Sequence, residues 1–62
     1  MSFKTLLIDD EPLARARLRR LLNQFEATFD INGEASNGAE GLALITDLRP
    51  DVIFLDIEMP LM

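Results

Sequence analysis

The chain has 62 residues, of which 48% are hydrophobic, and it carries a formal net charge of −5. A domain of roughly 60 residues buries only about 60% of the surface that its unfolded chain exposes, so this length supports one domain of marginal stability. Because the sequence has no cysteine and no histidine, it offers no disulfide and no structural zinc site. The acidic charge argues against non-specific nucleic-acid binding, which is built from Lys and Arg.

The sequence also bears on the cellular compartment of the protein. The first apolar run, Leu6-Leu7-Ile8, is interrupted by Asp9 and Asp10 too early to form the core of a signal peptide. No apolar run approaches the ~20 residues that a membrane-spanning helix needs. Together with the absence of cysteine, these features predict a cytoplasmic protein without a membrane anchor.

The first predicted element is a buried strand at Thr5–Asp9, because its three central residues form a short, continuous apolar run. Pro12 suits the first turn of a helix, with Asp10 or Glu11 in place to cap it. Apolar residues then recur at helical spacing and predict a helix over Pro12–Phe25. The residues of this stripe are Ala14, Leu18, Leu21, Leu22 and Phe25.

The remaining elements follow in the same way. Alternation of apolar and polar residues over Phe29–Ala35 predicts an edge strand with one wetter face. A turn is predicted at Ser36-Asn37-Gly38, because these residue types are typical of turns. Helical spacing then resumes until Pro50 stops the helix. Val52–Leu55 is a second bare apolar run, rich in strand formers, and it ends at Asp56. The order β-α-β-α-β predicts an α/β fold with parallel strands and right-handed crossovers.

Carboxylates follow both apolar strands. Asp9 and Asp10 end the first strand and Asp56 ends the third, and ligands of open parallel sheets gather at this edge. If these two strands are neighbours, three carboxylates converge, and they repel one another unless a cation neutralises them. Mg²⁺ is the natural cation, and a carboxylate beside it can accept a phosphoryl group. For Glu11, a helix cap or a first-turn charge is the better interpretation.

Four of the six basic residues lie on the first predicted helix. They are Arg15, Arg17, Arg19 and Arg20. A solvated helix face is the favoured interpretation, and contact with a partner or a nucleic acid is the alternative.

Several segments resemble one family. Leu7-Ile8-Asp9-Asp10-Glu11-Pro12 and Leu55-Asp56-Ile57-Glu58-Met59-Pro60 resemble the two signatures of bacterial response-regulator receiver domains. Ser36-Asn37-Gly38-Ala39-Glu40 and Arg49-Pro50-Asp51 are similar to the family's entries into the second helix and the third strand. Pro12-Leu13-Ala14-Arg15 resembles the first helix of regulators that carry a LytTR-type DNA-binding domain.

The resemblance implies a role for each site residue. Asp56 would be the phosphoacceptor, taking phosphate from the phosphohistidine of a histidine kinase, in a signalling module that is not a dedicated enzyme. Asp10 and Asp56 would bind Mg²⁺, Asp9 would act mainly through water, and the backbone carbonyl of Glu58 would be a further ligand. Pro60 would shape the following loop. Any contact with DNA would belong to an effector domain outside this chain.

The resemblance covers the first half of a receiver domain, whose sheet has the order 2-1-3-4-5. Residues 1–62 are therefore expected to form a flavodoxin-like half domain with a three-stranded sheet in the order 2-1-3. The Ser or Thr after strand four, the Lys after strand five and the aromatic switch residue have no counterpart. Because the hydroxyl and the lysine would stabilise the phosphoryl charge, transfer to Asp56 is expected to be impaired. The open edge of the third strand predicts a homodimer that completes the sheet.

Two other functions remain open. Asp56-Ile57-Glu58 is superficially similar to the strand-end Asp-x-Asp of haloacid-dehalogenase-like phosphatases, but Glu58 replaces the second Asp and the Asp9-Asp10 doublet goes unexplained. Alternatively, the chain is an inert structural or dimerising half domain.

Overall fold

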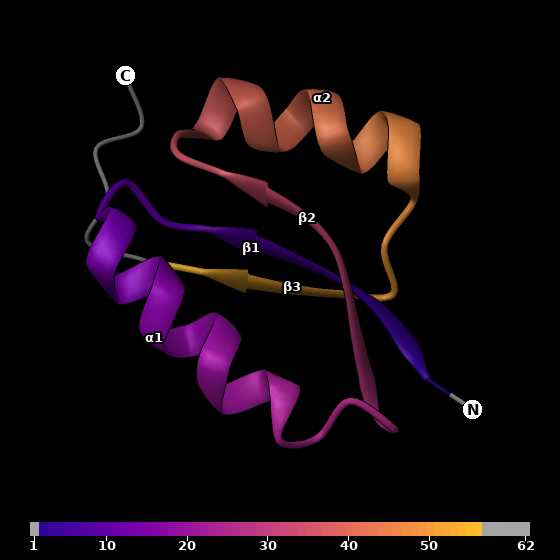
Figure 1. Ribbon diagram of the computed structural model, residues 1–62. Coiled ribbons are helices and arrows are strands. Elements are labelled where there is room, and N and C mark those ends of the chain that lie inside the picture. Colours follow the sequence, from indigo (N-terminus) through magenta and orange to yellow (C-terminus); the bar gives the residue numbers. More distant parts are fainter. Residues whose placement is uncertain (1, 57–62) are drawn as a thin grey trace.

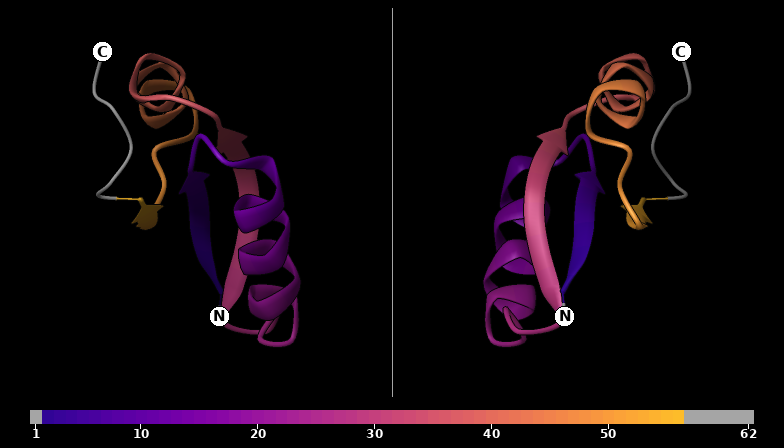
Figure 2. Two further views of the ribbon diagram at one scale, coloured as in Figure 1. Left: turned by 90° about the vertical axis from the view of Figure 1, so that its left-hand side faces the viewer. Right: turned by 90° about the vertical axis from the view of Figure 1, so that its right-hand side faces the viewer.

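The computed structural model describes residues 2–56, which form a three-stranded parallel sheet with one helix on each face (Figure 1). The elements in chain order are β1 (Phe3–Ile8), α1 (Pro12–Asn23), β2 (Phe29–Ala35), α2 (Gly38–Leu48) and β3 (Val52–Leu55). The strand order is β2-β1-β3. The predicted α/β fold, its element order and its strand order are therefore confirmed, and Figure 2 shows α1 and α2 on opposite sides of the sheet.

The core of the protein lies on the central strand, β1. Thr5, Leu6 and Leu7 have no exposed surface and Ile8 is 5% exposed. β1 is parallel to both neighbours, and it begins two residues earlier than predicted because the ladder to β2 already starts with Phe3 opposite Phe29. The strand that the sequence marks as most apolar is therefore the one enclosed on both sides.

A bulge in β2 brings Gly33 under α2. The register between β1 and β2 shifts after Thr5, so that Leu6 lies opposite Gly33. A Cβ atom at Gly33 would lie 2.7 Å from Cδ1 of Leu48 and 3.4 Å from Cδ1 of Leu6. The missing side chain therefore lets the end of α2 approach the sheet closely.

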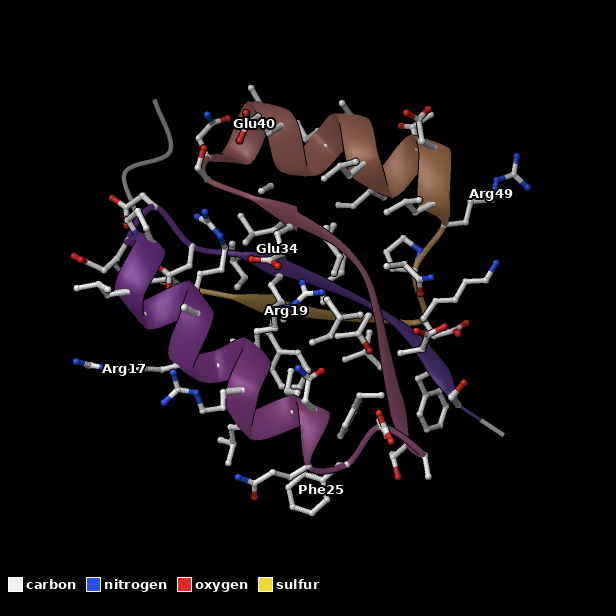
Figure 3. The ribbon with its side chains drawn as sticks, in the orientation of Figure 1. Arg17, Arg19, Phe25, Glu34, Glu40 and Arg49 are labelled. Atoms are coloured by element: carbon white, nitrogen blue, oxygen red, sulfur yellow. The ribbon has the colours of Figure 1, made fainter. Side chains whose placement is uncertain are left out.

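α1 is shorter than predicted. It ends at Asn23, and the chain then turns so that the carbonyl oxygen of Phe25 accepts hydrogen bonds from the amides of Thr28 and Phe29 at 2.8 and 2.9 Å. Leu22 is buried, but Leu21 and Phe25 are more than half exposed, and Figure 3 shows Phe25 beyond the end of the helix. The prediction that the apolar stripe continues through Phe25 is wrong, because the chain leaves the helix to enter β2.

α2 has a hydrogen-bonded start and a sharp stop. The Asn37 side chain accepts from the amide of Glu40 at 2.8 Å, and Glu40 in turn accepts from the amide and the hydroxyl of Ser36 at 2.8 and 2.6 Å. The hydrogen bonds from Ser36 lower the pKa of Glu40 below its usual value. Arg49 ends the helix in the left-handed conformation, with φ of 48°, directly before Pro50. The predicted turn and stop are both confirmed.

β3 is the most exposed of the strands. It pairs with β1 from Thr5 opposite Val52 to Ile8 opposite Leu55, and Ile53 and Leu55 remain 42% and 50% exposed. A groove of about 440 Å³ separates these two side chains from α2. Its lining is almost entirely apolar and consists of Ile8, Gly38, Ala39, Leu42, Ile45, Ile53 and Leu55. Within residues 2–56, neither helix is long and apolar enough to cross a membrane.

Candidate functional site

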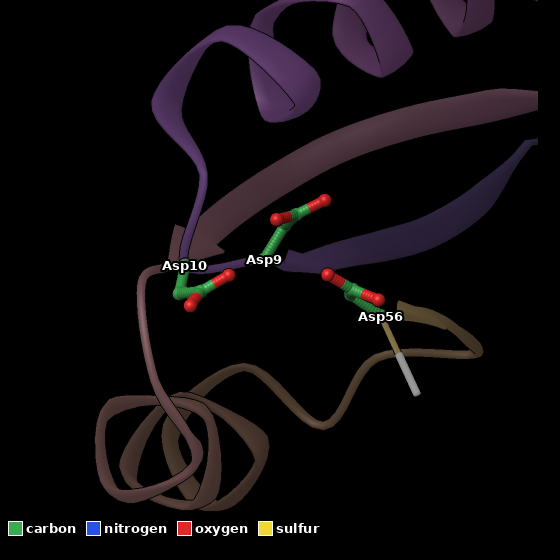
Figure 4. A group of neighbouring side chains, drawn as sticks. All are labelled: Asp9, Asp10 and Asp56. Carbon is green, nitrogen blue, oxygen red and sulfur yellow. The ribbon is translucent and has the colours of Figure 1, made fainter. Parts of the chain in front are cut away.

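Asp9, Asp10 and Asp56 meet at the carboxyl edge of the sheet. Asp9 directly follows β1, Asp56 directly follows β3, and the two strands are neighbours. The amide of Asp56 donates to the carbonyl oxygen of Ile8 at 3.1 Å, which extends the pairing of the strands to the site. One carboxylate oxygen from each of the three residues lies within 4.8 Å of the other two. Figure 4 shows the three carboxylates gathered at this edge.

The main chain around Asp9 is held at several points. Its amide donates to the carbonyl oxygen of Ala35 at 3.0 Å, which continues the ladder between β1 and β2. Its carboxylate accepts from the amide of Glu11 at 2.9 Å, and its carbonyl oxygen accepts from the Arg15 guanidinium at 2.6 Å. Asp9 is half-buried and Asp10 is exposed. The turn after β1 is therefore built around Asp9, and Asp10 is the more exposed of the two acids.

This donor set fits a hard divalent cation. Octahedral Mg²⁺ has oxygen ligands at about 2.0–2.1 Å, so its neighbouring ligands are roughly 3 Å apart and opposite ones roughly 4 Å apart. The carboxylate oxygens, which lie within 4.8 Å of one another, reach this spacing by small side-chain rotations, and water would complete the shell. Three negative groups at this spacing also repel, and a cation relieves that repulsion. The acidic cluster is the arrangement that the sequence predicts from its two strand ends.

A hollow of about 390 Å³ opens beside the carboxylates on the side of α1. Asp9 and Asp56 form its polar part, and apolar side chains of α1, β1 and β3 form the rest. A group that approaches Asp56 from this side therefore meets a mostly apolar wall.

Three further residues had an expected role near the site: Glu11, Glu58 and Pro60. Glu11 occupies the N-cap position of α1, as expected, but its side chain makes no capping hydrogen bond in the described structure. The Asp9 carboxylate instead accepts from the Glu11 amide. Glu58, predicted to offer its backbone carbonyl to the metal, and Pro60 lie outside the described residues.

The structure also gives a role to residues that the sequence did not single out for the site. Glu34 of β2 accepts from the guanidinium groups of both Arg15, at 3.0 Å, and Arg19. The Arg15 side chain is only 20% exposed, so the predicted solvated basic face does not include it. Figure 3 shows Arg19 beside Glu34, while Arg17 points away from the sheet. The four-residue spacing of Arg15 and Arg19 puts them on one helix face. This spacing is the sequence signal that both could bind the same acidic residue.

The comparisons with known proteins agree with this geometry. Residues 5–62 match the response regulator receiver domain family. The chain is 53% identical over 57 residues to the transcriptional regulatory protein BtsR of Escherichia coli K12, covering 92% of this chain and 23% of that protein. It is 53% identical over 55 residues to the positive alginate biosynthesis regulatory protein of Pseudomonas aeruginosa, covering 89% of this chain and 22% of that protein. The chain thus spans less than a quarter of the length of these curated relatives, and it belongs to the response regulator receiver domain family.

Proposed function

We propose that this chain is a phosphoacceptor module in which Asp56 receives a phosphoryl group from the phosphohistidine of a histidine kinase. The observation that carries the proposal is the meeting of Asp56 with Asp9 and Asp10 within 4.8 Å at the carboxyl edge of the sheet. A carboxylate oxygen of Asp56 forms the new bond to phosphorus, and the bond between phosphorus and the imidazole nitrogen breaks. The imidazole nitrogen keeps the electron pair and becomes protonated.

The neighbouring residues prepare Asp56 for this step. Asp10 and Asp56 offer carboxylate oxygens to Mg²⁺, and Asp9, already engaged with the Glu11 amide, acts mainly through water. When bound, Mg²⁺ neutralises negative charge on the phosphoryl oxygens and on the carboxylates. The backbone carbonyl of Glu58 is proposed as a further ligand. The hydrogen bond from the Asp56 amide to Ile8 keeps the acceptor in line with β1.

The transfer is expected to be slow in the 62-residue chain. The family resemblance implies a hydroxyl side chain and a lysine that bind the phosphoryl oxygens, at positions with no counterpart in this sequence. Losing one such donor costs a factor on the order of 10²–10³ in rate in other enzymes. When residues 1–62 are tested on their own, they are therefore proposed to accept phosphate at Asp56 slowly.

Intact-mass measurement after treatment with an acyl phosphate and Mg²⁺ tests this proposal. The expected result is a partial gain of one phosphoryl mass that requires Mg²⁺ and disappears in Asp56→Asn. Asp47→Asn is the matched control, because Asp47 is an exposed acid on α2. A gain that persists in Asp56→Asn places the phosphoryl group on another residue and overturns the assignment. No gain under any condition also overturns it and favours the inert half domain. Hydrolysis of an aryl phosphate that is lost in Asp56→Asn would instead support the phosphatase.

We also propose that two copies of the chain associate through β3. Within residues 2–56, β3 is paired on one side only, and Ile53 and Leu55 are exposed along the apolar groove. A two-fold axis places β3 antiparallel to its copy. At about 3.4 Å per residue, four residues separate the two ends of the strand by about 10 Å, which keeps the two acidic clusters apart.

Sedimentation velocity tests whether two copies of the chain associate through β3. A dimer at micromolar concentration that dissociates in Ile53→Lys is expected, because the charge would lie in the apolar contact. Asp30→Lys is the control, because Asp30 is exposed and lies on β2, at the opposite edge of the described sheet from β3. A folded monomer at micromolar concentration contradicts the proposal.

The relatives suggest the context of the module. BtsR is a transcriptional regulatory protein, and the Pseudomonas relative regulates alginate biosynthesis, as their names state. We therefore propose that a protein carrying this module regulates transcription, and that any DNA contact is made by an effector domain outside this chain.

A further inference from the structure

Arg15 links the acidic site to β2 through two separate contacts. Its Nη1 donates to the carbonyl oxygen of Asp9 at 2.6 Å, and its Nε donates to Oε1 of Glu34 at 3.0 Å. We propose that Arg15 is a positioning residue of the acidic site, which fixes the main chain at Asp9 and so holds the carboxylates after β1 in place. The part of this proposal that concerns Mg²⁺ rests on the proposed function; the part that concerns the turn does not.

The chemistry of the contact requires an arginine. The guanidinium is planar and carries donors that point in different directions, so one side chain can bond a carbonyl oxygen and a carboxylate at the same time. A lysine ammonium on a flexible stem lacks this fixed geometry. Because the Arg15 side chain is only 20% exposed, little water competes for these bonds.

Glu34 makes the contact compatible with a cation site. A positive guanidinium next to a cation-binding cluster would repel the cation, but Glu34 pairs with Arg15 and also with Arg19. The Glu34 carboxylate, which the two guanidinium groups share, thereby offsets part of the charge of Arg15. The arrangement supplies a strong donor to the Asp9 carbonyl while limiting the positive field at the carboxylates.

The contact matters because the turn after β1 carries two of the three carboxylates. The Asp9 carboxylate accepts from the Glu11 amide, and Asp10 lies between these two residues in the chain. A shift of the Asp9 carbonyl therefore moves both carboxylates relative to Asp56. Groups that orient metal ligands in this indirect way typically affect metal affinity by 10- to 100-fold.

Calorimetric Mg²⁺ titration of Arg15→Gln and Arg19→Gln separates positioning from charge. Both substitutions remove one positive charge from the same ion-paired group, but only Arg15 contacts Asp9. Charge alone predicts equal or tighter Mg²⁺ binding in both variants. Positioning predicts that Arg15→Gln weakens binding by on the order of tenfold, that Arg15→Lys does not restore it, and that Arg19→Gln stays within about twofold of the original chain. Equal affinities in Arg15→Gln and Arg19→Gln overturn the proposal.

Amide hydrogen exchange supplies a readout that needs no metal. In Arg15→Gln, the Glu11 amide, which bonds to Asp9, is expected to exchange about tenfold faster, while the amide of Leu7 in β1 stays protected. Arg19→Gln is expected to leave both amides unchanged. If the original chain binds no Mg²⁺, the proposed function fails. The exchange rate of the Glu11 amide still tests the role of Arg15 in that case. Unchanged Glu11 exchange in Arg15→Gln overturns the role.

Discussion

β1 and β3 both end in a carboxylate of the site, but the protein supports them differently. β1 has a partner strand on each side, and its residues Thr5–Ile8 are buried. β3 is paired on one side within the described residues, and its side chains alternate between half-buried and exposed. Among the strands of residues 2–56, Asp9 and Asp10 thus follow the best-packed one, and Asp56 follows the most exposed one.

The two halves of the site are therefore supported to different degrees. The half of the site on β1 is held by hydrogen bonds to β2 and α1 before any ligand arrives. The half on β3 is joined to β1 by the strand ladder, which the hydrogen bond from the Asp56 amide to Ile8 extends to the site. A ligand that bridges both strands should therefore stabilise β3 more than β1.

The largest expected effect comes from shortening a side chain in β1. Leu6→Ala removes a fully buried side chain, and such changes cost about 2–5 kcal/mol, which is comparable to the whole stability of a domain of this size. Ile53→Ala in β3 should cost about 1 kcal/mol or less, because Ile53 is 42% exposed. Urea unfolding at one low protein concentration measures both. Similar losses of unfolding free energy in the two variants would contradict the difference in packing between β1 and β3.

Mg²⁺ should stabilise the fold by joining the two strands. At a free concentration one hundred times the Kd, binding adds about 2.7 kcal/mol to the free energy of unfolding. The gain should largely vanish in Asp56→Asn and persist in Asp47→Asn, an equal charge change on α2. Thermal unfolding with and without Mg²⁺ measures it. An equal gain in both variants would show that Mg²⁺ acts as general screening rather than at the site.

Two glycines of α2, which packs against β1, differ in the space around them. A Cβ at Gly41 would lie 2.6 Å from Cδ1 of the buried Ile8, whereas a Cβ at Gly38 would meet nothing within 4 Å. Gly41→Ala should therefore be less stable than Gly38→Ala by about 1 kcal/mol, since overpacking outweighs the gain in helix propensity. Chemical denaturation measures the difference. Equal stability would mean that Ile8 moves aside without cost.

The smallest expected effect concerns the turn between β2 and α2. Hydrogen bonds from Ser36 lower the pKa of Glu40 below its ordinary value of 4.5, so the stabilisation they give is present above that value. It is lost as the pH falls through the lowered pKa of the folded state. Ser36→Ala removes the hydroxyl and should raise the pKa of Glu40 toward its ordinary value. A carboxyl NMR titration checks this, and an unchanged midpoint would contradict the role of the hydroxyl.

The sequence predicts the parts of the fold that depend on local pattern. The apolar runs of β1 and β3 and the stop at Pro50 are visible directly, and the parallel order brings Asp9 and Asp56 to one edge. The early end of α1 was missed because the helical spacing of Phe25 continues past the residue at which the chain turns. The role of Arg15 was missed because it depends on Glu34, which is distant in the sequence and meets Arg15 only when β2 pairs with β1.

A double-mutant cycle in Mg²⁺ affinity tests most directly whether the two strand ends form one site. Calorimetry would compare Asp10→Asn on the β1 side, Asp56→Asn after β3, and the double variant. If Asp10 and Asp56 share one ion, one Mg²⁺ binds per chain, each single variant binds it weakly, and the double variant loses less than the sum of the two single losses. Losses that add, or an affinity that Asp56→Asn leaves unchanged, would contradict a site shared between β1 and β3.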